Sequence, residues 1–97
     1  ADKLEMDNDN VRPYAARALG LIGDTRAVAP LSDTLADDES DTVRAAAAWA
    51  LRQIGTEEAL ETVAEYADEH SFLVQHEADL ATDALGDGDA DAEAPTA

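Results

Sequence analysis

The stretch that decides the fold occurs twice: residues 11–23 read VRPYAARALGLIG, and residues 43–55 read VRAAAAWALRQIG. The two copies begin 32 residues apart, and eight of their thirteen positions are identical. A third, weaker copy, VQHEADLATDALG, occupies residues 74–86 and begins 31 residues after the second. Three copies at nearly constant spacing indicate a structural repeat, in which stacked copies bury a core that one copy could not bury alone.

Each copy has the apolar spacing of one face of an α-helix. In the second copy this face comprises Val43, Ala47, Ala50, Leu51 and Ile54. Side chains that can accept a hydrogen bond from a helix N-terminus stand just before the copies: Asp9, Asp41 and Ser71. A glycine follows the last apolar position of each copy, where a left-handed residue ends a helix: Gly23, Gly55 and Gly86.

A second amphipathic segment follows each of the first two copies. Asp24 or Thr25 is the expected N-cap of the first such helix, and Thr56 is the expected N-cap of the second. Pro30 falls inside the first of these helices, where proline is a common cause of a bend. The sequence therefore predicts an all-α fold, an α-solenoid of about five helices at roughly 10–22, 25–36, 42–54, 57–69 and 72–85.

The signature V-R-x-x-A-A-x-A-L-x-x-I-G at residues 11–23 and 43–55 resembles the HEAT-like repeats of phycobilisome lyases. The resemblance implies a HEAT-like superhelix of paired antiparallel helices, in which each repeat contacts only its neighbours. It implies a scaffold rather than one particular chemistry. The expected organisation is a remnant or cap of a preceding helix, two repeats, a half repeat and a disordered acidic tail, at residues 1–8, 9–41, 42–71, 72–86 and 87–97.

The chain is strongly acidic, with 23 Asp and Glu residues against 6 Lys and Arg residues and a formal net charge of −17. Binding to nucleic acid requires a positive surface, so we expect no nucleic-acid partner. Abundant acid with scarce lysine resembles the proteins of halophilic archaea, in which salt screens repulsion between carboxylates. An acidic protein that binds a basic partner is the alternative. Full helicity in dilute buffer, measured by circular dichroism, would contradict the halophilic interpretation.

The sequence gives no sign of a membrane or secretory segment. No apolar run approaches the roughly 18 residues of a membrane span, and no charged-then-apolar leader opens the chain. We therefore expect a cytoplasmic location and no membrane partner. The chain has no cysteine, which excludes disulfides and thiol catalysis. No cofactor is expected.

The outer flanks of the first and third copies predict how the stack of repeats ends. On one flank the third copy turns polar, with Asp79 and Thr82, as a closed terminal helix requires. On the opposite flank the first copy stays apolar, with Tyr14 and Leu21. We expect this amino-terminal flank to be covered by residues 1–8, by a preceding repeat, or by self-association with another copy. Full exposure of Tyr14 and Leu21 in a monomer would contradict this interpretation.

One dipeptide, His76-Glu77, resembles the His-Glu pairs that hold two irons in deoxyhypusine hydroxylase, which is also built from HEAT-like repeats. The matching positions 13–14 and 45–46 hold Pro-Tyr and Ala-Ala, which cannot ligate a metal. One pair does not supply the ligands of a di-iron centre. We therefore expect a surface histidine beside a solvated glutamate, with no metal site and no catalytic residues. The alternative is a fragment of a larger repeat enzyme of the metal-dependent hydroxylase or lyase type.

The candidate partner-binding surface is the outward face of the second helix of each repeat, which lines the inner curve of solenoids of this type. Its expected residues are Arg26, Asp33, Asp37, Glu58, Glu61, Glu65 and Glu69. Such a face could be a negatively charged groove for a basic segment of a protein partner, whose binding would weaken with salt. A solvated halophilic surface is the alternative. The function that the sequence predicts is a non-catalytic protein–protein interaction scaffold.

Overall fold

The computed structural model describes residues 12–93, with side chains described for residues 12–86. No strand occurs in this part of the chain, so the predicted all-α fold is confirmed. The elements, in chain order, are α1 (Arg12–Ile22), the 3₁₀ helix η2 (Thr25–Ala27), α2 (Val28–Asp37), α3 (Asp41–Ile54), α4 (Glu57–Ala64) and α5 (Phe72–Glu93).

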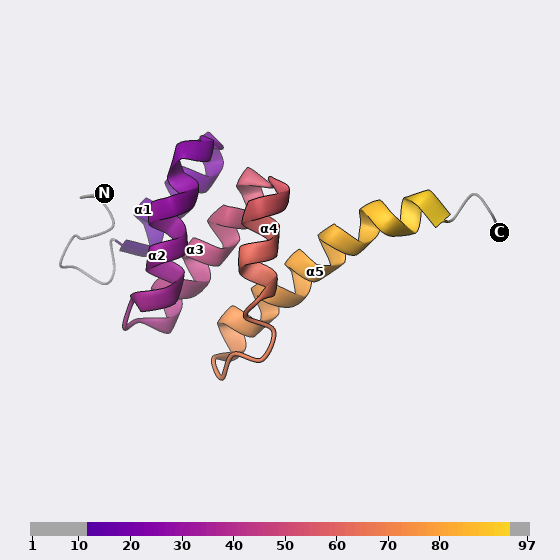
Figure 1. Ribbon diagram of the computed structural model, residues 1–97. Coiled ribbons are helices and arrows are strands. Elements are labelled where there is room, and N and C mark those ends of the chain that lie inside the picture. Colours follow the sequence, from indigo (N-terminus) through magenta and orange to yellow (C-terminus); the bar gives the residue numbers. More distant parts are fainter. Residues whose placement is uncertain (1–11, 94–97) are drawn as a thin grey trace.

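The helices form two layers (Figure 1). The first helices of the three copies, α1, α3 and α5, lie in one layer, and the second helices, α2 and α4, lie in the other. Within the first layer α3 packs against α1 on one side and α5 on the other, and it also contacts α2 and α4. This arrangement is that of an α-solenoid, in which the central repeat joins its two neighbours.

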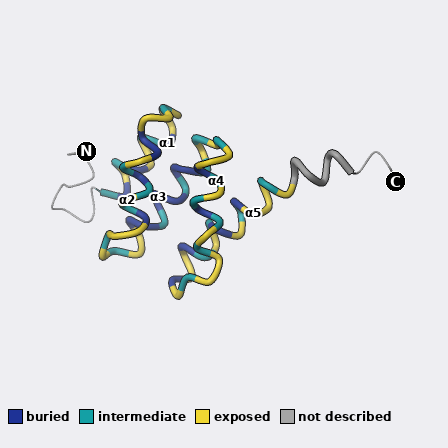
Figure 2. The backbone as a smooth tube through the Cα atoms, in the orientation of Figure 1, coloured by how far each residue is buried: buried dark blue, intermediate teal, exposed yellow. Residues whose placement is uncertain are grey.

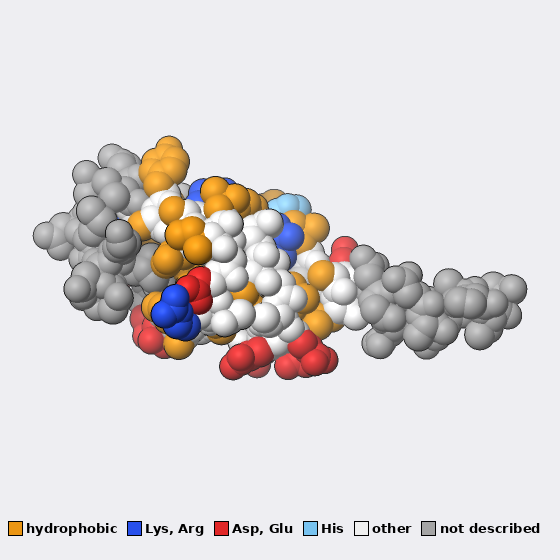
Figure 3. All heavy atoms as spheres, turned by 90° about the horizontal axis from the view of Figure 1, so that it is seen from above, with side chains coloured by type: hydrophobic (Ala, Val, Ile, Leu, Met, Phe, Trp, Pro, Cys, Tyr) orange, Lys and Arg blue, Asp and Glu red, His pale blue; other side chains and the backbone are white. Residues whose placement is uncertain are grey.

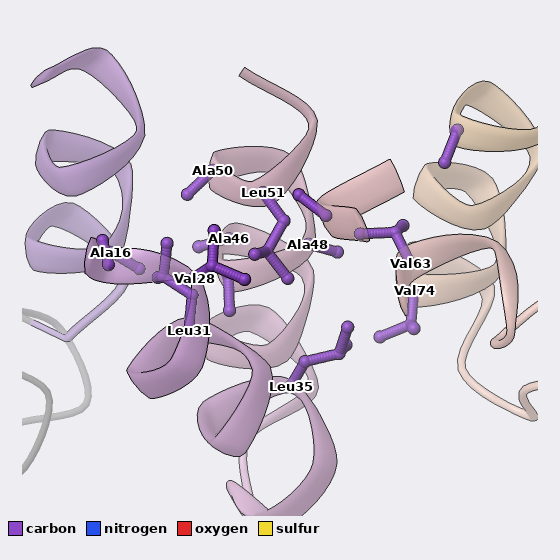
Figure 4. Packing of buried hydrophobic residues seen from close by; sticks show 14 of the residues in the cluster. Ala16, Val28, Leu31, Leu35, Ala46, Ala48, Ala50, Leu51, Val63 and Val74 are labelled. Atoms are coloured by element: carbon purple, nitrogen blue, oxygen red, sulfur yellow. The ribbon is translucent and has the colours of Figure 1, made fainter. Parts of the chain in front are cut away.

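The core consists of a few larger aliphatic side chains set among many alanines. The largest fully buried side chains are Leu31, Leu35, Val43, Leu51, Val63 and Val74, several of which meet between the layers in Figure 4. Figure 2 shows buried backbone running along the inner sides of the helices and exposed backbone along the outer sides. Apart from Ala18 and Ile22 of α1, which are exposed, the described apolar positions that match among the three copies fill or line one shared core, as their helical spacing predicts.

Neighbouring first helices pack in two different ways at one position of the repeat. Gly20 of α1 lies directly against Ala50 of α3, where an added Cβ would be 2.6 Å from the Ala50 Cα atom. The matching residue of α3 is Arg52, whose Nε lies 2.7 Å from a carboxylate oxygen of Glu77 in α5. One helix pair thus meets by close backbone approach, which glycine permits, and the other is joined by an ion pair.

Local sequence signals explain where most helices begin and end. Thr56 caps α4 as predicted, because its Oγ1 accepts a hydrogen bond from the Ala59 N–H at 3.1 Å. Asp24 caps η2 through its side chain. Gly23 and Gly55 both have φ of 76°, the left-handed conformation that ends a helix. Asp9 lies outside the described residues.

The predicted cap of α3 was wrong by one residue. Ser40 is the N-cap, with its Oγ accepting from the Val43 N–H at 3.3 Å. Asp41 is the first helical residue, and its negative charge is favourable there because the helix N-terminus is positive.

Pro30 lies in the first turn of a helix and not in the helix interior where the sequence placed it. The 3₁₀ helix η2 ends at Ala27 and α2 begins at Val28, which places Pro30 in the first turn of α2. Backbone N–H groups in a first turn have no acceptor within the helix, so the missing proton of proline costs little there.

The predicted fourth helix is too long, since α4 ends at Ala64 rather than at residue 69. After Ala64 the chain forms 3₁₀-type turns, in which the Tyr66 N–H bonds to the Val63 carbonyl at 3.0 Å and the Glu69 N–H bonds to the Tyr66 carbonyl at 3.0 Å.

The predicted fifth helix is too short, since α5 continues through Gly86 to Glu93. Gly86 is not among the described residues with positive φ, so it continues the helix instead of ending it. The expected disordered tail begins inside this helical segment, and residues 94–97 lie outside the described part, as do residues 1–8.

The two ends of the stack differ in polarity. At the α5 end, Asp79 and Thr82 are exposed, as predicted for a polar closing surface. At the α1 end, Tyr14 and Leu21 are 73% and 75% exposed. No described residue covers these two side chains. Of the three expected covers, residues 1–8 lie outside the described part of the chain, and a preceding repeat or a second copy stays a prediction. Ile22, which the repeat matches to the half-buried Ile54, is also 71% exposed, because no described helix packs against this side of α1.

Candidate partner-binding surface

The carboxylates predicted for the second helices lie on the outer side of the second layer. Asp33 and Asp37 of α2 and Glu58 and Glu61 of α4 are exposed, and Glu65 is exposed at the C-cap of α4. These five residues are called the acidic face below. The opposite sides of α2 and α4 carry buried leucine, alanine and valine, so packing on the core fixes the outward direction of the acids. Acidic side chains gather along one rim in Figure 3.

Arg26 adds no free positive charge to this surface. Its Nη2 lies 2.7 Å from the Asp24 carboxylate, and its side chain is mostly exposed. The hydrogen bond from the Arg26 side chain lowers the pKa of Asp24 to about 2. An exposed pair of this kind contributes little to stability. Arg26 therefore forms a local ion pair with Asp24 at η2. It does not neutralise the five carboxylates of the acidic face.

Glu69 does not share the outward face, so its predicted position was wrong. Because α4 ends at Ala64, Glu69 follows the helix in an irregular turn, and its carboxylate receives two hydrogen bonds from Arg44 at 2.7 and 3.1 Å. Both side chains are only 10% exposed. The side-chain hydrogen bond from Arg44 lowers the pKa of Glu69 from 4.5 to about 2, so Glu69 is an internal ion-pair partner.

The arginine of the repeat signature joins the two helices of its own repeat. Arg12 donates to the Asp38 carboxylate at 3.1 and 3.2 Å, and Arg44 does the same to Glu69 in the next repeat. In such a pair, the guanidinium donates two hydrogen bonds to one carboxylate, so it fixes the relative orientation of the two side chains as well as neutralising their charges. Arg44 also donates from Nε to the Leu35 carbonyl of the preceding repeat at 2.7 Å. Sequence reasoning missed these pairs, although an acid recurs 26 and 25 residues after the two arginines.

The third copy replaces this arginine by a neutral side chain, Gln75. Its Nε2 donates to the Glu69 carbonyl at 3.2 Å, which preserves a bond to the preceding repeat. Arg12 and Arg44 each bind an acid beyond the end of the following α-helix, but no described helix follows α5 to supply such an acid. The amide of Gln75 therefore makes only the bond to the preceding repeat.

The His76-Glu77 pair does not match its expected surroundings. His76 is exposed as predicted, but Glu77 is not solvated, because its carboxylate accepts from Arg52 at 2.7 Å and its side chain is only 14% exposed. Elsewhere, His70 Nδ1 lies 2.8 Å from Glu69. No group of three or more His, Cys, Asp or Glu residues placed to hold a metal ion was found in the described part of the chain.

A comparison with protein families gives a match to HEAT repeats over residues 1–91. The chain belongs to the HEAT repeat family. The match agrees with the stacked helix pairs, and HEAT repeats generally serve as scaffolds for protein interaction. A search among curated proteins found no match. None of the helices described for this HEAT repeat protein has the length and apolar character needed to cross a membrane.

The Arg44–Glu69 pair predicts how the stability of this HEAT repeat protein depends on pH. We expect Glu69→Gln to lower the urea midpoint of unfolding near neutral pH, with a deficit that disappears toward low pH. The folded-state pKa of Glu69 is lowered from 4.5 to about 2. The ionised carboxylate therefore contributes its full stabilisation above pH 4.5, and this contribution is lost progressively as the pH falls from 4.5 to about 2. Urea titrations followed by circular dichroism at several pH values measure the difference.

Glu65→Gln is the matched control, because it removes the same charge from an exposed position that pairs with no described arginine. Its effect on the midpoint should be small. If both variants give the same pH profile, the stabilising role of the Arg44–Glu69 pair is refuted.

Proposed function

We propose that this HEAT repeat protein is a non-catalytic scaffold whose acidic face binds a basic segment of a protein partner. The observation that carries the proposal is a division among the carboxylates. Asp38, Glu69 and Glu77 each bind an arginine, whereas none of the five acids of the acidic face pairs with an arginine among the described residues. Unpaired carboxylates on one face attract and orient a positively charged partner.

The rigidity of the face supports the same proposal. Leu35 of α2 and Val63 of α4 are fully buried, so both helices are anchored in the core. Arg44 bonds to the end of α2 and to the turn after α4, which ties the two second helices to α3. A surface that is ordered before binding loses less conformational entropy when the partner arrives.

A two-site variant tests the proposal. We expect Glu61→Gln combined with Glu65→Gln to weaken binding of a lysine-rich amphipathic peptide by about tenfold, a loss typical of close charge pairs. Fluorescence anisotropy of the labelled peptide measures the dissociation constant across a salt series.

The matched control is Asp79→Asn combined with Asp83→Asn, which removes two exposed charges from α5 instead. This control should retain most of the affinity. An equal loss in both variants would show that only net charge attracts the peptide, and would refute a specific acidic face.

The alternative function is that of a fragment of a larger enzyme, of the metal-dependent hydroxylase or lyase type. The Arg52–Glu77 ion pair counts against it, because it occupies the carboxylate that would have to ligate the metal. Near-stoichiometric iron in the purified protein would favour the enzyme.

The phycobilisome-lyase type of repeat, the cytoplasmic location and the halophilic archaeal origin also remain proposals. For the last of these, a salt titration of the circular dichroism signal is the test, since full helicity in dilute buffer would oppose it.

A further inference from the structure

The outer side of α1 is the surface that other first helices use for stacking. Ala50 of α3 is fully buried against α1, and Ala46 lies one turn earlier on the same buried face. The matching residue of α5, Ala81, is also fully buried, and α5 packs against α3 and α4. In α1, however, the matching residue Ala18 is exposed. The α1 helix therefore presents a stacking surface on which no described helix lies.

This surface is a continuous apolar stripe. Tyr14, Ala18, Leu21 and Ile22 follow the spacing of one helix face, and they are called the open face of α1. Its three large side chains are each more than 70% exposed. Hydrophobic side chains gather at this end of the molecule in Figure 3, away from the extended α5. Contiguous exposed apolar surface of this kind marks an interaction site.

The distribution of charge indicates what covers the open face of α1. The protein carries a net charge of −17, yet α1 (RPYAARALGLI) contains two arginines and no acid, unlike the other four α-helices of the described chain. Two copies that approach through any other helix bring carboxylates together, whereas two α1 helices do not. The opposite end of the stack carries exposed Asp79, Thr82 and Asp83, so head-to-tail stacking would place polar groups on the apolar stripe.

We propose that two copies of this protein pair through their open faces, with the two α1 helices antiparallel and Ala18 near the two-fold axis. Tyr14 and Ile22 lie at equal distances in sequence on either side of Ala18. A two-fold axis at Ala18 therefore sets Tyr14 of each copy against Ile22 of the partner subunit. The small side chain of Ala18 lets the helices approach closely, as Gly20 and Ala50 do within the chain. This pairing uses a different surface from the acidic face, so either proposal can fail without the other.

Sedimentation equilibrium of the full chain in molar salt tests the pairing, because salt screens the repulsion between two acidic chains. We expect the natural sequence to form dimers at micromolar concentration. Ala18→Glu should raise the dimer dissociation constant by about a hundredfold, since two like charges would meet at the axis. Glutamate is a good helix former at this exposed position, so the fold should persist. Ala84→Glu adds the same charge to an exposed site of α5 and should leave the dimer intact.

A second experiment locates the axis directly. The chain has no cysteine, so Ala18→Cys provides one thiol per copy, which should form a disulfide-linked dimer on mild oxidation, whereas Ala84→Cys should not. A natural sequence that stays monomeric, as it would if another segment of its own chain covered α1, overturns the proposal. Dimers that survive Ala18→Glu, or equal cross-linking of both cysteine variants, overturn it as well.

Discussion

Leu51→Ala is expected to unfold a large fraction of the protein under conditions in which the natural sequence is folded. Leu51 is fully buried on α3, the helix that contacts all four other α-helices. Most of the buried residues in the core cluster that contains Leu51 are alanines, whose short side chains cannot reach into the space that the lost atoms leave. Truncating a buried leucine costs about 2–5 kcal/mol, a large share of the roughly 5–15 kcal/mol that stabilises a typical domain.

Urea denaturation in molar salt, followed by circular dichroism, measures this loss as a lower midpoint with an unchanged slope. Leu73→Ala is the matched control, because Leu73 is 51% exposed in the first turn of α5. Its expected cost is below about 1 kcal/mol, as for most surface substitutions. An unchanged midpoint for Leu51→Ala would mean that the α3 core is assigned to the wrong residues.

The sequence predicted the helices well because local physics decides them. Val43 and Leu51 fall on one face of α3 through helical periodicity alone, and both are fully buried. Gly55 ends that helix because its φ of 76° suits glycine better than any other residue. Thr56 begins the next helix through a side-chain hydrogen bond that involves only its near neighbours. The helical face, the helix end and the cap depend only on near neighbours in the sequence, whereas the burial of Val43 and Leu51 also needs the helices that pack on α3.

Burial at the end of the stack could not be predicted in this way. Ile22 and Ile54 occupy identical positions of the repeat, yet one is 71% exposed and the other is half-buried. The difference comes from the presence or absence of a neighbouring helix. Periodicity shows which face a helix would bury, but it does not supply the surface that covers that face.

The outward positions of the acids that form the acidic face were predicted in part. Glu61 and Glu65 lie where the helical spacing places them, but Glu69, one further turn along, does not, because helix ends are the least certain feature of such a pattern. The Arg44–Glu69 pair brings together residues that are far apart in sequence and depends on the tertiary fold. The repeat held an overlooked signal, since Arg12 and Asp38 recur one repeat later at nearly the same separation.

Gly20→Ala is expected to destabilise the protein even though alanine favours helices. In a free helix this change would gain about 0.5–1 kcal/mol. At Gly20 the new Cβ would lie 2.6 Å from the Cα and 2.8 Å from the Cβ of Ala50. Because these contacts involve backbone, α1 and α3 must separate, and overpacking of this kind costs about 1–3 kcal/mol. A net loss of about 1–2 kcal/mol should lower the urea midpoint.

Gly86→Ala makes the same chemical change in a helix where the new Cβ would meet nothing within 4 Å. There only the propensity gain applies, so helicity should rise and the midpoint should not fall. The opposite signs of the two variants separate helix propensity from the close approach of α1 and α3. If Gly20→Ala stabilised the protein as well, the two helices would have to be free to move apart, and the tight α1–α3 contact would not be a determinant of the stack.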